Sequence, residues 1–271
     1  MMKNFSIVLF TAVISLIVTS CSQNAITGRK QLALISDSEL TNMAKQEYQT
    51  FLSQNKVVSA SASKDAEMVR RIGQRLTTAI TKYYSEKGLS KELEGYEWEY
   101  NLVDSKEANA WCMPGGKIVV YTGLLPITQN EAALAVVMGH EIAHALAKHG
   151  NERMSQTMLA QGLQVVGGVV TSGNAQVSNI FNNVYGPAAQ VGVLLPNSRK
   201  QELEADRFGL IFSALAGYNP QEAITLWQRM EQAAGSSKPP EFLSTHPAES
   251  TRIQKLQQLM PEALKYYKPM N

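Results

Sequence analysis

The pentapeptide His140-Glu141-Ile142-Ala143-His144 constrains the fold of this chain more than any other feature. It lies within the apolar stretch 132–147, which is typical of a buried helix. On a helix, two histidines four residues apart leave the same face one turn apart. Unpaired histidines inside a core are costly, whereas one zinc ion can bind two imidazoles at about 2 Å. The sequence therefore predicts a buried helix with two zinc ligands; two solvated histidines are the alternative.

Glu141 follows the first histidine and lies about 100° around the helix from it. This position, at the edge of the metal-binding face, suits a carboxylate that takes a proton from water rather than one that binds metal. The spacing is the H-E-x-x-H pattern of zinc peptidases. It predicts a hydrolytic zinc enzyme with Glu141 as its general base.

A catalytic zinc needs a third protein ligand and one open position. His149 stands five residues after His144, about 140° around a regular helix, and we expect a supporting or surface residue there. The metzincin extension is absent, because Ala147 and Gly150 occupy the positions of its glycine and third histidine. The third ligand must therefore come from elsewhere in the chain.

Glu202 and Asp206 are the better candidates, since they are four residues apart on one face of a later predicted helix. One carboxylate could bind zinc while the other accepts the N–H of a ligating histidine. A carboxylate pair with this spacing also occurs on solvated helix faces. Spacing alone leaves both interpretations open.

Hydrophobic periodicity predicts an α+β fold, mainly helical, with a small β-sheet before the active-site helix. Thr128 and Glu131 have the spacing of a capping box for that helix. Residues 171–197 lack a sustained period and are expected to form a long loop with one short helix, a mobile lid over the cleft. Strands are predicted at 96–103, 108–113 and 117–121, with a turn at 114–116, and helices at 37–54, 64–85, 129–149, 151–170, 199–216, 220–234 and 247–259.

The first residues resemble an export signal. Lys3 precedes the apolar stretch 5–20, which is short for a membrane span. Val18-Thr19-Ser20-Cys21 then resembles a bacterial lipobox, which implies cleavage before Cys21 and acylation of that residue. An uncleaved anchor helix and an ordinary secretory signal are the alternatives. We therefore expect a signal peptide at 1–20, a tether at 21–36 and a metallopeptidase domain at 37–271.

Charge and cysteine content narrow the remaining possibilities. The net charge of +2 gives no basis for a nucleic-acid partner. Cys112 is the only other cysteine, so a mature chain starting at Cys21 has no internal disulfide if Cys21 is acylated. The fold must be held by its core and by a metal.

The H-E-x-x-H motif followed by Glu202-x-Glu204-Ala205-Asp206 resembles the gluzincin metalloproteases of the HtpX and CAAX prenyl protease family. Residues 24–34 are similar to the opening of its periplasmic lipoprotein branch, which includes BepA and LoiP, and residues 109–116 resemble the strand before its active helix. The resemblance implies that His140, His144 and Glu202 bind one zinc ion per chain, that Asp206 supports them, and that Asn109 and Ala110 lie on a substrate-binding edge strand.

The same resemblance implies a membrane-anchored zinc metalloendopeptidase acting on protein or peptide substrates, in particular misfolded or unassembled cell-envelope proteins. The expected location is the cell envelope, lipid-anchored at the outer membrane and facing the periplasm. The chain lacks the transmembrane helices of HtpX and ends at Asn271 without the tetratricopeptide repeats of BepA. Prenylated peptides and adaptor-like binding are therefore not expected.

His246 lies in Ser244-Thr245-His246-Pro247. As a lone loop histidine it suits a surface or capping role, but the resemblance implies that it can reach the zinc and act as a fourth or switch ligand. The main rival function is a chaperone-like or scaffold lipoprotein whose zinc site is structural, closed by four ligands. A second rival is a metal-binding lipoprotein without hydrolysis. The intact Glu141 argues against the main rival, because a structural site needs no base.

Overall fold

The computed structural model describes residues 21–161, 175–185, 198–235, 240–246 and 251–269. The predicted signal peptide at 1–20 lies outside these residues. So do residues 171–174 and 186–197 of the predicted lid. The short helix expected in that stretch is present as α7 (Ala175–Tyr185).

A four-stranded sheet has the order β3-β4-β6-β5. Strands β4 (Glu99–Val103) and β6 (Lys117–Tyr121) are parallel, while β3 (Val57–Val58) and β5 (Ala110–Met113) pair antiparallel with their neighbours. The predicted turn between β5 and β6 is confirmed, with Gly115 and Gly116 at φ of 78° and 86°. Strand β5 is therefore an outer strand of this sheet.

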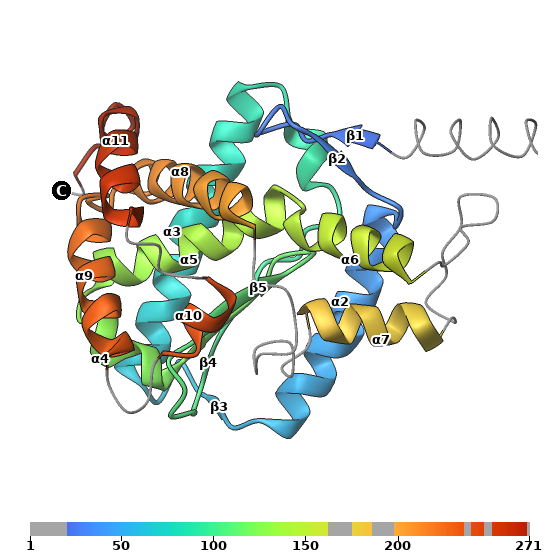
Figure 1. Ribbon diagram of the computed structural model, residues 1–271. Coiled ribbons are helices and arrows are strands. Elements are labelled where there is room, and N and C mark those ends of the chain that lie inside the picture. Colours follow the sequence, from blue (N-terminus) through green and yellow to red (C-terminus); the bar gives the residue numbers. More distant parts are fainter. Residues whose placement is uncertain (1–20, 162–174, 186–197, 236–239, 247–250, 270–271) are drawn as a thin grey trace, which may run out of the picture.

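Helices cover both faces of the sheet (Figure 1). Ile118 and Val120 point into one apolar cluster with α3 (Lys64–Glu86) and α5 (Glu131–Leu146). Val119 and Tyr121 point into a second cluster with α2 (Asp37–Gln54). Alternate residues of one strand are thus buried on opposite sides, and the predicted small sheet of an α+β fold is confirmed.

Four helices begin and end within two residues of their predicted bounds: α2, α3, α8 (Arg199–Leu215) and α9 (Glu222–Ala234). Helix α5 agrees with its prediction only at its start. The predicted capping box at Thr128 is wrong. Thr128 ends the short helix α4 (Leu125–Thr128), and Gln129 has a left-handed φ of 63°. The extended residue is therefore Asn130, whose side chain accepts a hydrogen bond from the Ala133 N–H at 2.8 Å.

The predicted helix 129–149 is also interrupted. It ends at Leu146, and α6 (His149–Ala160) starts in a new direction because Lys148 has a φ of 55°. At the other end of the chain, α11 (Arg252–Leu264) begins later than predicted and continues past Pro261. Residues 247–250 lie outside the described part. The four-residue helix α10 (Phe242–Thr245) was not predicted.

Residues 21–36, expected as a tether, lie ordered against the helices. Strands β1 (Cys21–Gln23) and β2 (Lys30–Leu32) form a hairpin. The Asn24 side chain donates to the Leu146 carbonyl oxygen at 3.0 Å, at the end of α5. The Leu34 N–H donates to Ser155 Oγ on α6 at 2.9 Å. The hairpin is therefore part of the packed structure.

Among the described residues, no helix is long and apolar enough to cross a membrane.

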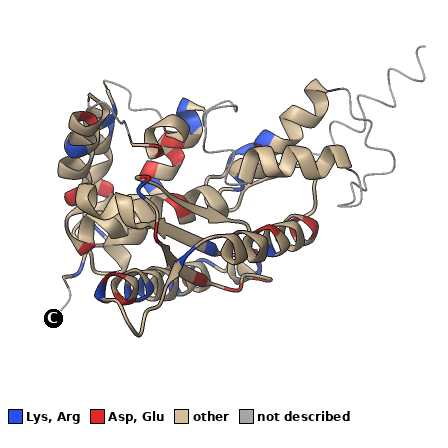
Figure 2. Ribbon diagram, turned by 90° about the horizontal axis from the view of Figure 1, so that it is seen from below, with Lys and Arg blue, Asp and Glu red and all other residues tan. Residues whose placement is uncertain are grey.

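Basic and acidic residues are interleaved over the helices (Figure 2). Several form ion pairs, such as Arg207 with Glu262 at 2.7 Å between α8 and α11.

Helices α5 and α8 pack side by side, and this contact positions the site (Figure 1). Gly139 and Gly209 face each other across it. A Cβ atom at Gly209 would lie 2.8 Å from the backbone nitrogen of His140. Only glycine permits this approach, which brings the residues of α8 next to the two histidines of α5.

Candidate metal centre

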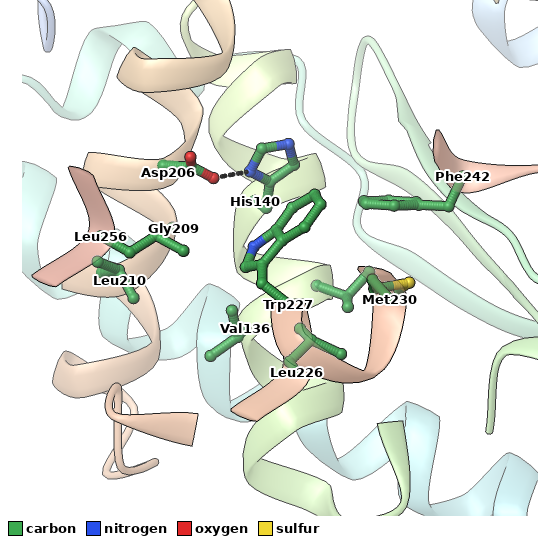
Figure 3. A pocket seen from close by; sticks show the side chains of 11 residues that line it. Val136, His140, Asp206, Gly209, Leu210, Leu226, Trp227, Met230, Phe242 and Leu256 are labelled. Atoms are coloured by element: carbon green, nitrogen blue, oxygen red, sulfur yellow. Dashed lines mark ion pairs between the residues drawn. The ribbon is translucent and has the colours of Figure 1, made fainter. Parts of the chain in front are cut away.

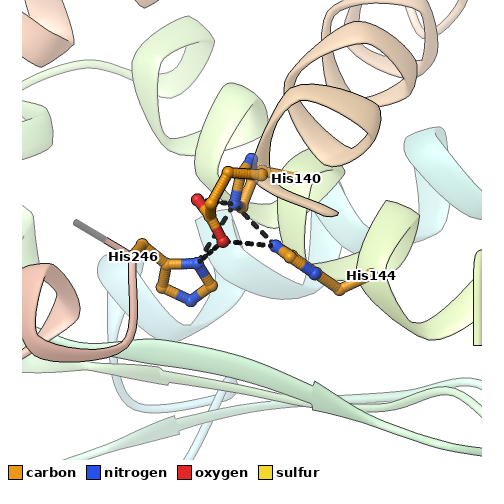
Figure 4. A group of neighbouring side chains, drawn as sticks. His140, His144 and His246 are labelled. Atoms are coloured by element: carbon orange, nitrogen blue, oxygen red, sulfur yellow. Dashed lines mark hydrogen bonds and ion pairs between the residues drawn. The ribbon is translucent and has the colours of Figure 1, made fainter. Parts of the chain in front are cut away.

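Four buried side chains from three segments converge at one point (Figure 4). His140 and His144 come from α5, Glu202 from the first turn of α8, and His246 from the end of α10. One candidate ligand atom of each lies within 4.8 Å of the others. The structure thus brings together the three predicted zinc ligands and the predicted fourth ligand.

The spacing of these atoms fits a tetrahedral zinc ion. The Nε2 atoms of His140 and His144 are 3.0 Å apart. Glu202 Oε1 lies 3.2 Å from His144 Nε2, and Glu202 Oε2 lies 3.5 Å from His140 Nε2. Ligands held about 2.1 Å from a tetrahedral ion are about 3.4 Å apart. These groups offer lone pairs to one another, so a cation at their centre satisfies them together. The donor set of nitrogen and carboxylate oxygen is one that zinc prefers.

Asp206 lies one helical turn beyond Glu202 and holds the far side of His140. Its Oδ1 is 3.1 Å from His140 Nδ1. A carboxylate that accepts the Nδ1–H leaves Nε2 free to bind metal. Burial alone would lower the pKa of His140, but the hydrogen bonds that its ring donates to the carboxylates of Asp206 and Glu202 outweigh this effect and raise that pKa to about 9 in the metal-free protein.

Arg252 completes the acidic side of the site, and the sequence analysis missed it. Its guanidinium lies 2.8 Å from Glu202 Oε2 and 2.7 Å from Asp206 Oδ1, and its carbon is 3.6 Å from the centre of the Trp227 ring. Burial would raise the pKa of Asp206, but the charge of Arg252 and the hydrogen bond with His140 lower it overall. Arg252 shares the helical face of the buried Leu256 and Met260, and this was the signal available in the sequence.

Glu141 is 5% exposed and lies beside the metal group. Its Oε1 atom is 3.4 Å from His246 Nε2 and, among the described residues, accepts no hydrogen bond. Burial raises the pKa of Glu141. A carboxylate in this state is suited to accept a proton.

His149 contacts the predicted ligand His144, although it stands five positions further along the chain. The break at Lys148 turns its ring back, so that His149 Nδ1 lies 2.8 Å from His144 Nδ1. Its Nε2 lies 3.0 Å from Glu204 Oε2. A regular helix, as expected from the sequence, would have directed His149 away from His144.

The segment that carries His246 also lines a small apolar hollow beneath His140 (Figure 3). The Phe242 ring stacks on the His246 ring at 4.4 Å between centres. The Phe242 N–H donates to the Ala108 carbonyl oxygen at 3.0 Å, just before β5. This contact connects the His246 segment to the outer strand of the sheet.

Asn109 and Ala110 lie where the edge strand was predicted. Asn109 is buried, and its carbonyl oxygen accepts the Tyr121 N–H at 3.0 Å, within the sheet. The Ala110 N–H instead donates to the Asn109 side chain at 2.8 Å. Ala110 is the first residue of the outer strand β5. The role of both residues in substrate binding stays a prediction.

A mainly helical domain with a small sheet, a buried H-E-x-x-H helix and a glutamate from a second helix define a zincin-like metallopeptidase of the gluzincin type. Comparison with known families agrees, because residues 64–260 match the profile of peptidase family M48. The chain belongs to this family.

The relatives of this chain are named as metalloendopeptidases or proteases. The chain is 37% identical over 168 residues to the mitochondrial metalloendopeptidase OMA1 of Schizosaccharomyces pombe, covering 62% of this chain and 48% of that protein. It is 30% identical over 264 residues to the OMA1 of Bos taurus, covering 93% and 48%. It is 32% identical over 164 residues to the beta-barrel assembly-enhancing protease of Escherichia coli, covering 58% and 33%. The chain spans at most about half the length of these relatives.

These comparisons correct the predicted location. The expected location at the outer membrane of the cell envelope, facing the periplasm, is wrong, because the relatives that match over the longer stretches, 168 and 264 residues against 164, are mitochondrial metalloendopeptidases. They also support the gluzincin family as a whole, without singling out HtpX, the prenyl proteases or the lipoprotein branch.

Proposed function

We propose that the chain is a zinc-dependent endopeptidase. The observation that carries the proposal is the group formed by His140 Nε2, His144 Nε2 and the Glu202 carboxylate, with the buried Glu141 beside it. When bound there, zinc would polarise the scissile carbonyl and lower the pKa of a water molecule. Ligation by His140, His144 and Glu202 leaves a fourth position for substrate or water.

The protein's own groups move the proton and hold the ligands. Glu141 accepts a proton from the attacking water and passes it to the leaving amine. Its raised pKa brings it closer to the range in which a carboxylate both takes and returns a proton. Asp206 orients His140, and Arg252 holds the carboxylates of Asp206 and Glu202 in place.

We further propose that substrates bind as an added strand along β5. Main-chain hydrogen bonds then supply most of the affinity, so extended segments of unfolded proteins are the expected substrates and sequence preference is loose. The position of β5 at the outside of the sheet supports this. Cleavage of misfolded or unassembled cell-envelope proteins has narrower support, namely the similarity to the beta-barrel assembly-enhancing protease.

The position of His246 supports the proposal that the enzyme has a latent form. Its Nδ1 lies 3.0 Å from Glu202 Oε1 and 3.3 Å from His140 Nε2, so it can occupy the fourth position. In the same segment, the Phe242 N–H donates a hydrogen bond to the carbonyl oxygen of Ala108, next to β5. Movement of residues 242–246 would then open both the metal and the strand edge. A closed structural site uses the same contacts, and an active His246→Ala protein would separate the two functions.

Catalysis is tested with Glu141→Gln, which keeps the shape of the side chain and removes the base. We expect one zinc per chain in both proteins and loss of casein cleavage, at least a hundredfold, only in the variant. Glu131→Gln on the same helix is the matched control. Absence of zinc from the wild type, or equal cleavage by Glu141→Gln, would contradict the proposal.

The domain bounds and the modification of Cys21 stay proposals. Val18-Thr19-Ser20-Cys21 supports cleavage before Cys21 and acylation of that residue. The mass of the purified mature chain measures both directly. An unmodified Cys21, or an intact residue 1–20 segment, would exclude this processing. The remaining residues, 37–271, would form the catalytic domain.

A further inference from the structure

A continuous series of polar contacts connects the metal group to the N-terminal hairpin. His144 Nδ1 lies 2.8 Å from His149 Nδ1, and His149 Nε2 lies 3.0 Å from Glu204 Oε2. The Arg29 Nε donates to both Glu204 oxygens at 2.8 and 3.2 Å. Arg29, between β1 and β2, is thus three contacts away from a predicted zinc ligand.

This relay is shielded from water. The His149 side chain is fully buried, and the side chains of Arg29 and Glu204 are 13% and 16% exposed. The other end of the Arg29 guanidinium makes two hydrogen bonds with Glu152, at 2.6 and 2.7 Å. Gln201 also donates to Glu152, at 2.9 Å. Arg29 therefore lies in a fixed fork between two carboxylates, a geometry that lysine cannot reproduce.

The donors and acceptors between Glu204, His149 and His144 follow from the charge of the Glu204 carboxylate. An ionised Glu204 only accepts, so His149 donates its Nε2–H to it. In the neutral imidazole the other nitrogen, Nδ1, is then an acceptor. His144 must donate its own Nδ1–H to that atom, which leaves the lone pair on His144 Nε2. This is the atom that faces His140 Nε2 at 3.0 Å and Glu202 at 3.2 Å.

We propose that Arg29, Glu204 and His149 are positioning residues that fix the tautomer and orientation of His144 for zinc binding. Asp206 does the same for His140, so each histidine of the motif has its own support. Arg29 lies outside the stretch 64–260 that matches the family profile. The hairpin thereby contributes to the metal site without touching it. The consequence for catalysis rests on the proposed function, but the consequence for zinc affinity does not.

The first test measures zinc affinity by competition with a chromophoric chelator, with Zn²⁺ itself as the probe. Removal of a group that supports a metal ligand costs about 10- to 100-fold in affinity. We expect such a loss in Arg29→Ala and Glu204→Gln, and a partial loss in Arg29→Lys. Arg207→Ala is the matched control. Arg207 lies on α8, as Glu204 does, and makes a similar forked pair with Glu262 of α11, away from the metal group. Zinc affinity within twofold of wild type in Glu204→Gln would overturn the proposal.

The second test separates positioning from a general effect on folding. If Arg29 acts through His149, Arg29→Ala should lose no more than twofold further affinity in a His149→Gln background. Full additivity of the two losses would overturn the proposal. Circular dichroism of the metal-free proteins confirms that each is folded; if Arg29→Ala is not, Arg29→Lys takes its place in the cycle. A wild type that shows this coupling but cleaves no protein would refute the proposed function and leave the relay intact.

Discussion

Replacement of Gly209 by alanine tests how closely the metal group depends on the packing of α5 against α8. The added Cβ would lie 2.8 Å from the nitrogen and 2.9 Å from the Cα of His140, and 3.2 Å from the carbonyl carbon of Gly139. These are backbone atoms inside a helix, so no flexible side chain can give way. The two helices must move apart by about 0.6 Å to restore an ordinary contact.

The expected cost has two opposing parts. Overpacking of a core costs about 1–3 kcal/mol, while alanine is favoured over glycine inside a helix by about 0.8–1.0 kcal/mol. The net loss is about 0–2 kcal/mol, which lowers the Tm of a chain of this size by up to about 8 °C. Zinc affinity should fall more noticeably, at least about tenfold, because Glu202 moves with α8 while His140 and His144 stay on α5 and zinc distances vary by only about 0.2 Å.

Two measurements are needed, thermal unfolding of the metal-free protein and zinc affinity. Gly235→Ala, at the end of α9, is the matched control, since its added Cβ would lie 3.6 Å from the nearest atom. We expect little change in that variant. If Gly209→Ala and Gly235→Ala have the same Tm and zinc affinity, the argument from close helix packing is refuted.

Three further predictions follow from the site. His246→Ala should raise basal casein cleavage several-fold while zinc stays bound, and loss of zinc or of activity would show that His246 supports the site instead. Chelation of zinc should lower the Tm by about 5–10 °C if zinc is at about a hundredfold excess over its Kd, and His140→Ala should have no zinc-dependent change in Tm. Burial would raise the pKa of Glu152, but the hydrogen bonds from Arg29 lower it overall. Because the folded pKa is depressed, this stabilisation is complete above the ordinary glutamate pKa of about 4.3 and is lost as the pH falls through the folded value. The free energy of unfolding, measured with urea from pH 6 to 3, should therefore fall less steeply with falling pH for Glu152→Gln than for the wild type. Equal slopes of the two curves would exclude this contribution of Glu152.

The local parts of the site were predictable because they depend on short sequence spacing. Helical periodicity placed His140 and His144 on one face of a buried helix, and Glu202 and Asp206 on one face of another. The Pro-Gly-Gly turn and the strand at 117–121 were predicted for the same reason. His149 was expected to support the site or to lie on the surface. Its direct contact with His144 was not predictable, because it depends on the left-handed φ of a single residue, Lys148.

The sequence by itself determined which residues are the candidates to bind zinc and to act as the base, since ligand type and helical spacing are properties of a few neighbouring residues. Tertiary structure decided which distant groups support them. Arg252 reaches Glu202 and Asp206 across 46 or more positions, and Arg29 reaches Glu204 across 175. Periodicity carries no information on such pairs, because they meet only when α5, α8, α11 and the N-terminal hairpin pack together. That packing depends on the volume of side chains at every contact, including the missing Cβ atoms of Gly139 and Gly209.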